Sequence, residues 1–281
     1  MTTKTKTTPD EKPAEEQQLA TGQQAGALAT NYEDDGFETV EAGDLSIPFL
    51  GVLQALSPQV QGDAVVDGAK PGMLFNTVTE ELIDGKTGLE FIPCLVDQCV
   101  VEWVPRDRGG GYVARHERDA QVVEDARARA SAPNEMATEA GNQLVETKYI
   151  YGIGIHPDGR QEPLVLSFAS TKITVFRRLM TKLRMFTIQD PAAKGGKRTP
   201  SLFEHRLRIT SVSQTNKKGS FYNFSVGSAE GDLRSSLIPR DSDLFAEAVA
   251  LRESIKSGRA TAAVESQDGG ESAASGDDIP F

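Results

Sequence analysis

The segment from Lys148 to Gly227 constrains the fold more than any other part of the chain. Its apolar spacing and turn residues predict six elements, in the order strand 149–156, strand 163–168, amphipathic helix 171–186, basic loop 194–199, strand 203–213 and strand 220–226. Before them, residues 89–104 form the longest β-like run of the chain, with Asp97-Gln98 predicting a bulge or bend in its middle. The chain is therefore expected to be mainly β.

This order of elements favours an OB-fold-like barrel of five strands, in which one helix separates strands 3 and 4. The helix has Ile173, Phe176, Met180 and Leu183 on one stripe, with Leu179 beside them. Core packing explains that stripe, and the helix is expected to cap the barrel. In the fourth strand, Leu207 and Ile209 are expected to face the core, and Val212 is a further candidate for that face.

The chain divides into four predicted parts. Residues 1–36 are poor in large apolar side chains and are expected to be disordered. The OB-fold-like domain is expected at 37–240, with a polar insertion at about 116–146 that contains a short helix between 117 and 130. Within this domain, residues 44–60 are interrupted by Pro48, Gly51 and Pro58 and predict a helical turn or an edge piece. An amphipathic helix at 241–257, which could support self-association, precedes a disordered acidic tail at 258–281.

No apolar run reaches membrane length, and the N-terminus lacks the apolar region of a signal peptide. We therefore expect a cytoplasmic protein, in the host cytoplasm if a phage encodes it. The two cysteines, Cys94 and Cys99, lie in or beside the long apolar run and are expected to be free, buried or half-buried thiols.

Positive charge is concentrated in one part of an acidic protein. Between Lys172 and Lys218 there are twelve Lys or Arg against Asp190 and Glu204, a local charge of +10. The whole chain carries −11, which leaves −21 for the remainder. A concentrated positive field of this kind indicates a polyanionic partner.

Single-stranded nucleic acid needs cations for its phosphates and aromatic rings for its bases, and this chain interleaves both. The candidates for base stacking are Trp103, Tyr112, Tyr149, Tyr151, Phe221 and Tyr222. The candidates for phosphate contact are Arg106, Arg108, Lys172, Arg177, Lys182, Arg206, Arg208, Lys217 and Lys218. For each one taken singly, core packing of the ring or solvation of the charge is the competing interpretation. The glycine-rich loop 104–111 fits a hairpin turn or a DNA-contacting loop equally well.

Signatures of catalysis are weak. The run from Gly195 to Thr199 resembles a phosphate loop only superficially, because arginine follows its lysine where Ser or Thr is required. No paired carboxylates, metal-ligand spacing or nucleophile elbow stands out. We expect a protein that is not an enzyme and that needs no metal or cofactor.

The chain ends in Asp277-Asp278-Ile279-Pro280-Phe281 after a long polar segment. In this the sequence resembles the bacterial single-stranded DNA-binding proteins, whose acidic tail closes with the same five residues. The larger core, the run from Glu102 to Gly111 and the hairpin 216–224 look more like divergent single-stranded DNA-binding proteins of bacteriophages. The resemblance implies that the tip docks replication, recombination or repair enzymes such as a polymerase, helicase, nuclease or primase. A carboxylate beside an aromatic ring suits an apolar pocket with a basic rim.

The function expected from sequence is thus non-specific coating of single-stranded DNA and recruitment of partner enzymes. The nearest alternative is a recombination mediator or strand-annealing protein that uses the same surface. A more distant alternative is a virion structural or host-inhibiting protein whose basic segment meets an acidic protein. A nuclease is the alternative that the residues favour least.

Overall fold

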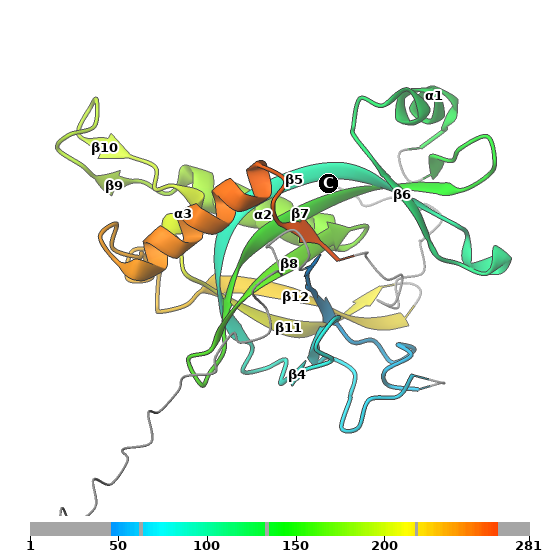
Figure 1. Ribbon diagram of the computed structural model, residues 1–281, viewed down its shortest axis with the longest axis horizontal. Coiled ribbons are helices and arrows are strands. Elements are labelled where there is room, and N and C mark those ends of the chain that lie inside the picture. The colour runs from blue at the N-terminus through cyan, green and yellow to red at the C-terminus, as the bar shows by residue number, and fades with distance from the viewer. Residues whose placement is uncertain (1–45, 62–63, 133–134, 217–218, 264–281) are drawn as a thin grey trace, which may run out of the picture. The chain divides into compact units, whose positions relative to one another are not determined.

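The computed structural model describes residues 46–61, 64–132, 135–216 and 219–263 (Figure 1). They belong to one structural unit, Glu41–Phe281. The predicted disordered segment 1–36, most of the predicted tail, and the candidate residues Lys217, Lys218 and Asp277–Phe281 lie outside the described residues. In the described ranges, no helix is both long enough and apolar enough to cross a membrane.

The long strand β5 (Leu89–Trp103) is the centre of a nine-stranded sheet. On one edge it pairs antiparallel with β7 (Gln143–Ile155) along nearly its whole length. On the other edge it pairs with β11 (Leu207–Asn216) near its start and with β6 (Tyr112–His116) near its end. β-branched and aromatic residues favour such a strand, because both of its faces can be buried. β5 therefore joins parts of the chain that are far apart in sequence.

Two further antiparallel strands complete a Greek key. Strand β8 (Gln161–Ala169) pairs with β7, and β12 (Gly219–Ser228) pairs with β11. Strands β11, β5, β7 and β8 thus lie in the spatial order 4-1-2-3. The connection from β8 to β11 holds α2 (Lys172–Met185), the hairpin of β9 (Ile188–Gln189) and β10 (Lys197–Arg198), and the 3-10 turn Leu202–Glu204. The strands and the helix predicted after Lys148 are present in the predicted order, and the fold is mainly β. Two details differ from the prediction: the expected loop 194–199 contains β10, and residues 203–204 belong to the 3-10 turn, so that β11 begins only at Leu207.

The sheet is larger than the five strands that we expected. Strand β2 (Phe49–Val52) adds to β8 in parallel, β3 (Leu74–Asn76) adds to β2, and β4 (Leu82–Ile83) adds to β3. The prediction of a helical turn or edge piece at residues 44–60 was wrong, because Pro48 lies just before the strand and contributes only its carbonyl to the ladder. The carbonyl of Pro48 accepts a hydrogen bond from the Val165 N–H at 2.9 Å, and no proline N–H is required there.

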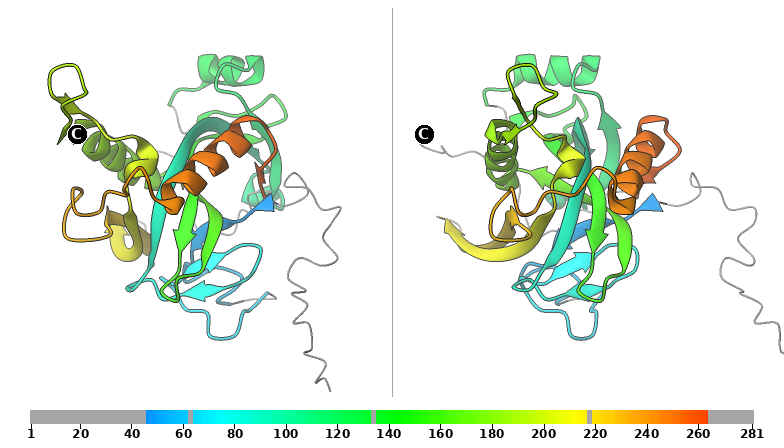
Figure 2. Two further views of the ribbon diagram at one scale, coloured as in Figure 1. Left: turned by 60° about the vertical axis from the view of Figure 1, so that its left-hand side comes forward. Right: turned by 90° about the vertical axis from the view of Figure 1, so that its left-hand side faces the viewer.

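Helices α2 and α3 (Asp243–Lys256) cover opposite faces of the curled sheet, as both views in Figure 2 show. Successive residues of a strand point to opposite faces, and β7 illustrates this. Ile150 belongs to the large core under α2, whereas Tyr149 and Tyr151 belong to a cluster on the face of α3. From the predicted stripe of α2, Phe176, Leu179 and Leu183 are buried, and Ile173 and Met180 are half-buried.

The predicted insertion is partly sheet and partly helix. The strand β6 forms a hairpin with β5, through the 3-10 turn Arg106–Arg108, and α1 (Gln121–Arg129) follows it. Val123 and Ala126 of α1 pack with Val100 of β5 and Leu144 of β7. The insertion is therefore fastened to the end of the central strand by its own small core.

A short parallel pair joins the two ends of the described chain. Strand β1 (Ser46–Ile47) pairs with β13 (Thr261–Ala262), and the Ala263 N–H donates to the Ile47 carbonyl at 2.9 Å. Ile47 packs in the cluster on the α3 face. Residues 261–262, which the sequence analysis placed in the tail, are thus part of the fold.

Three local predictions can be compared with the structure. The register of β5 shifts between Pro93 and Leu95 and between Glu102 and Trp103, whereas Asp97 and Gln98 remain in register. Pro93 has no N–H to donate, which explains the first shift better than the polar pair does. Val212 is 42% exposed, because a residue three positions after Ile209 faces the other side of the strand. Both cysteines are free and buried, as predicted, and burial raises the pKa of Cys94 to about 12.

Candidate nucleic-acid interface

Helix α2 presents an exposed basic face. Its apolar residues Phe176, Leu179 and Leu183 pack on the sheet, and no acidic residue occurs between Lys172 and Met185. Four exposed basic side chains lie on the remaining surface: Arg177, Arg178, Lys182 and Arg184. Among the residues that the structure describes, none forms an ion pair with any of these four. Their charges are therefore available to an external anion.

The hairpin of β9 and β10, which follows α2, adds exposed lysines at positions 194 and 197. Arg198 in the same hairpin is different, because its guanidinium pairs with Asp190 at 2.8 Å and with Glu204 at 2.6 Å. The carboxylate of Glu204 also accepts hydrogen bonds from Arg240 and from the Ser201 N–H. Burial alone would raise the pKa of Glu204, but these hydrogen bonds outweigh burial and hold it at about 2. Arg198 thus stabilises the fold.

Two predicted phosphate contacts, one on β11 and one just before it, are neutralised within the protein. Arg208 lies opposite Glu90 in the ladder and pairs with it at 2.7 Å. Arg206 pairs with Glu90 at 3.3 Å and also with Glu230. Both arginines face the side of β11 opposite to Leu207 and Ile209, where Glu90 of the neighbouring strand meets them. The structure thus separates these two cations from the unpaired set on α2.

The loop from Val104 to Gly111 connects β5 and β6 as a hairpin. Arg108 holds this loop to the turn before β7, because its guanidinium donates to the Ala140 carbonyl at 2.9 Å and to Asn142 Oδ1 at 3.1 Å. Arg106 is exposed on the same loop. The segment forms a hairpin turn, in which Arg108 has a structural role, and contact of this loop with DNA stays a prediction.

Three of the six predicted stacking rings are buried. Trp103, Tyr149 and Tyr151 are 8%, 4% and 7% exposed and lie in the cluster that Leu251 and Ile255 of α3 complete. The rings also contact one another, with 6.3 Å between the centroids of Tyr149 and Tyr151. A base could stack on these rings only if α3 moved away. The burial of these rings could not be predicted from sequence. The alternation along β7 suggested one exposed face, whereas both faces are covered in the structure.

The other three rings lie at separate places. Tyr112 is 38% exposed and meets Trp103 edge to face, with 5.9 Å between ring centroids. Phe221 and Tyr222 on β12 are half-buried, and Tyr222 packs against the core under α2. The Lys172 ammonium, another predicted phosphate contact, lies 5.6 Å from the centroid of the Phe224 ring. The structure therefore does not gather all predicted residues on a single surface.

Sequence analysis overlooked Lys148 of β7. It is only 8% exposed and lies between Gln98 of β5 and Phe168 of β8. The available signal was a single charge at the start of the strongly apolar run Tyr149–Ile155. Because Lys148 is two residues from Ile150, it belongs to the face of the sheet that α2 covers.

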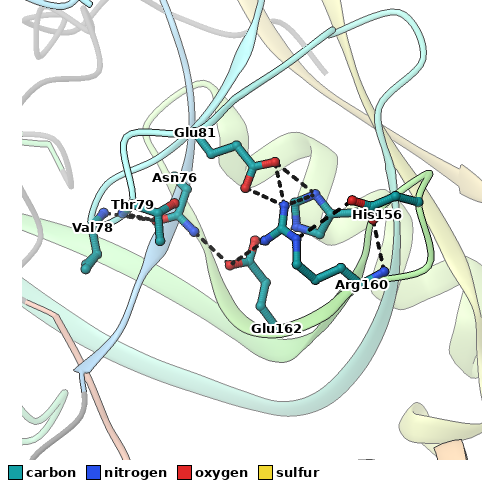
Figure 3. Close-up of polar contacts among 8 residues, drawn as sticks. Asn76, Val78, Thr79, Glu81, His156, Arg160 and Glu162 are labelled. Atoms are coloured by element: carbon teal, nitrogen blue, oxygen red, sulfur yellow. Dashed lines mark hydrogen bonds and ion pairs between the residues drawn. The ribbon is translucent and has the colours of Figure 1, made fainter. Parts of the chain in front are cut away.

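A second polar cluster joins the β3–β4 and β7–β8 turns (Figure 3). Atoms of Glu81, His156 and Glu162 that could bind a metal ion lie within 4.8 Å of one another. The guanidinium of Arg160 lies among them, 2.6 Å from both Glu81 oxygens and 3.3 Å from His156 Nδ1. His156 Nε2 is 2.6 Å from Glu162. Each of these side chains already has a hydrogen-bond or ion-pair partner, so the cluster connects the two turns to each other.

Comparison with known proteins identifies a family. The chain matches the family described as "Pam3 phage gp34-like protein" over residues 15–261. It belongs to this family. No match was found among curated proteins or among solved structures.

The matched region of this gp34-like chain includes the basic face of α2 and Lys148, and it ends before the terminal residues Asp277–Phe281. The family description names a phage, which supports the expected bacteriophage origin.

Proposed function

We propose that this gp34-like chain binds single-stranded DNA without sequence preference. It coats exposed strands during phage DNA replication, recombination or repair, and it recruits partner enzymes through Asp277–Phe281. The observation that carries the proposal is the exposed face of α2, where four basic side chains have no acidic partner in the described residues. Fixed, unpaired cations on a rigid element attract the phosphate backbone whatever the base sequence.

The strand order supports the same function. The order of strands β5, β7, β8, β11 and β12, with α2 between the third and fourth, resembles the element order of an OB-fold. We interpret these five as an OB-like barrel elaborated by β2, β3 and β4 on one edge and by β6 and α1 on the other. OB-folds bind single strands through a basic groove and aromatic platforms. Tyr112, Phe221 and Tyr222 are the predicted rings that remain accessible or half-accessible for stacking.

The acidic tip fits recruitment of a protein rather than contact with DNA. The carboxylates of Asp277 and Asp278 repel phosphate, whereas a pocket with a basic rim and an apolar floor would accept them together with Phe281. A polar connecting segment keeps such a tip at high local concentration near bound DNA. The similarity of the tip to that of bacterial single-stranded DNA-binding proteins supports the same role here.

Fluorescence anisotropy of a labelled oligo-dT, titrated at several salt concentrations beside a duplex of equal length, tests the proposal. We expect tight binding to the single strand and weak binding to the duplex. If about five phosphates are neutralised, the logarithm of affinity falls against the logarithm of salt with a slope near −3.5. Absence of binding at low salt would overturn the proposal. Acceleration of annealing between complementary strands in a parallel assay would favour a strand-annealing protein.

A further inference from the structure

Lys148 is a largely covered lysine whose ammonium has no hydrogen bond or ion pair among the described residues. The residue is 8% exposed, but its ammonium is not fully buried. Two buried carboxylates of the same chain show the usual arrangement. Glu102 contacts His116 at 2.8 Å and Asn142 at 2.7 Å, and Glu204 pairs with two arginines. Lys148 differs from both, because its charge lies on a largely covered residue and has no hydrogen-bonded or ion-paired partner in the described residues.

The surroundings of Lys148 are basic. Burial lowers its pKa, and the charges of Arg118 and Arg177 lower it further, against the opposing effect of Glu146. Arg118 donates to the side chain of Gln98 at 3.4 Å, and Gln98 is the ladder neighbour of Lys148. Glu146 is shared, because it also lies 3.9 Å from Arg127 of α1. Arg118 is thus placed beside Lys148 through Gln98, and Arg177 lies on α2, the helix that covers the same face of the sheet.

The three cations come from three different elements. Lys148 belongs to the sheet, Arg177 to α2, and Arg118 to the turn that precedes α1. Arg118 and Arg177 are both exposed, so the cluster reaches from the covered sheet face to the surface. A fold gains nothing by placing like charges together, unless an anion binds between them.

We propose that Lys148, Arg118 and Arg177 together bind one phosphate group of single-stranded DNA. This inference rests on the proposed function and adds to it a defined contact. The ammonium of the lysine supplies a compact positive charge in a fixed position. The guanidinium groups of the arginines can each donate two parallel hydrogen bonds to the phosphate oxygens. Because the rest of the basic face continues along α2, the bound strand would pass from α2 to the insertion that carries α1. The site would then recognise the phosphodiester backbone and would not distinguish one base from another.

The test compares Lys148→Met with Lys256→Met in the oligo-dT titration. Methionine keeps most of the volume of lysine and removes the charge, and Lys256 is an exposed lysine on α3, across the sheet. We expect Lys148→Met to weaken binding about tenfold at low salt and to reduce the steepness of the salt slope by about 0.7. Lys256→Met should change affinity less than about twofold.

Arg177→Gln and the double variant of Arg177 and Lys148 provide a second measurement. Arg177 is exposed on α2, so its replacement should preserve the fold. If both residues contact one phosphate, the loss in the double variant should be smaller than the product of the single losses. Fully multiplicative losses would place the two residues on separate phosphates and overturn the shared site.

The outcomes separate this inference from the proposed function. If the unaltered protein fails to bind oligo-dT, the proposed function fails. If it binds, and folded Lys148→Met binds with unchanged affinity and salt slope, the phosphate site fails while the function stands. If Lys148→Met does not fold, the variants Arg177→Gln and Arg118→Gln test the site instead. Unchanged DNA binding by both variants would overturn the phosphate site.

Discussion

The side chain of Gln54 pairs with the backbone of Tyr222 as a neighbouring strand would. Gln54 Nε2 donates to the Tyr222 carbonyl at 2.8 Å, and the Tyr222 N–H donates to Gln54 Oε1 at 2.8 Å. Gln54 follows β2, whereas Tyr222 lies on β12, the first strand of the sheet order and five strands away from β2. One buried amide thus links β12 to a distant part of the sheet and brings the curled sheet toward closure.

We expect Gln54→Glu to lower the free energy of unfolding by about 2–4 kcal/mol. The carboxylate cannot donate to the Tyr222 carbonyl, and it places a charge at a position that is 5% exposed. Urea unfolding at pH 7 measures the change. The matched control is Gln189→Glu, an exposed position on β9 where the effect should stay within about 0.5 kcal/mol. Equal stability of both variants would show that the amide pair does not close the sheet.

The pKa of Glu204 predicts a pH-dependent contribution to stability. Its folded value of about 2 lies below the ordinary 4.5, so its stabilisation is present above pH 4.5 and is lost as the pH falls toward 2. At pH 7, Glu204→Gln should cost about 3 kcal/mol, because Arg198 and Arg240 lose their shared partner. Urea midpoints from pH 7 to pH 2.5 should converge for the two proteins. A constant difference over that range would contradict the assignment.

His205 should make the protein sensitive to mild acid. It is 1% exposed, neither ring nitrogen has a partner in the described residues, and burial lowers its pKa below 6.5. Because the unfolded chain takes up this proton first, stability falls as the pH drops below about 6.5. His205→Leu removes the titration, so its stability relative to the original protein should improve between pH 7 and pH 5. Parallel curves of unfolding free energy against pH would refute this prediction.

Arginines on α2 and on β11 should behave differently. Arg178→Gln removes an unpaired exposed charge, so it should weaken oligo-dT binding about threefold to tenfold and make the salt dependence shallower. Arg208→Gln removes a charge that Glu90 already neutralises, so DNA affinity should change less than about twofold. Anisotropy titrations of the two variants at one salt concentration make the comparison. An equal loss in both would show that DNA also contacts β11.

Deletion of Asp277–Phe281 should separate recruitment from DNA binding. We expect the shortened protein to lose its interaction with the partner enzyme while DNA affinity is unchanged or improved, because negative charge is removed. Binding of an isolated Asp-Asp-Ile-Pro-Phe peptide to candidate replication enzymes, with a reversed-sequence peptide as control, identifies the partner. Weaker DNA binding after the deletion would contradict the assigned role of the tip.

Periodicity and turn residues were sufficient to predict most of the central elements. The run Leu89–Trp103, the stripe of α2 and the apolar strands β7 and β8 depend on local patterns that adjacent residues carry. The four-residue strand β2 was missed because a short apolar segment broken by proline and glycine matches several local structures equally well. Only its partners β8 and β3, which are distant in sequence, make it a strand.

The candidate interface was harder to predict, because charge balance depends on contacts between distant residues. From the sequence alone, Arg208 was interpreted as a cation available to DNA. In the structure it is neutralised by Glu90, which lies 118 positions away in the sequence. Tyr149 and Tyr151 suggest stacking platforms until α3 is placed over them. Lys148 is the reverse case, because it was left out of the predicted site. A single charge in a strand resembles a solvated side chain until both neighbouring strands are known.

The pairing of β1 with β13 makes the two boundaries of the folded region depend on each other. Ser46 and Ile47 are held by Thr261 and Ala262, and Ile47 also packs in the cluster on the α3 face. A cut that removes either short strand would leave the other without its ladder and would uncover apolar surface. Limited proteolysis from one end should therefore loosen both ends together, and a minimal fragment must keep residues 46 to 263 as a whole.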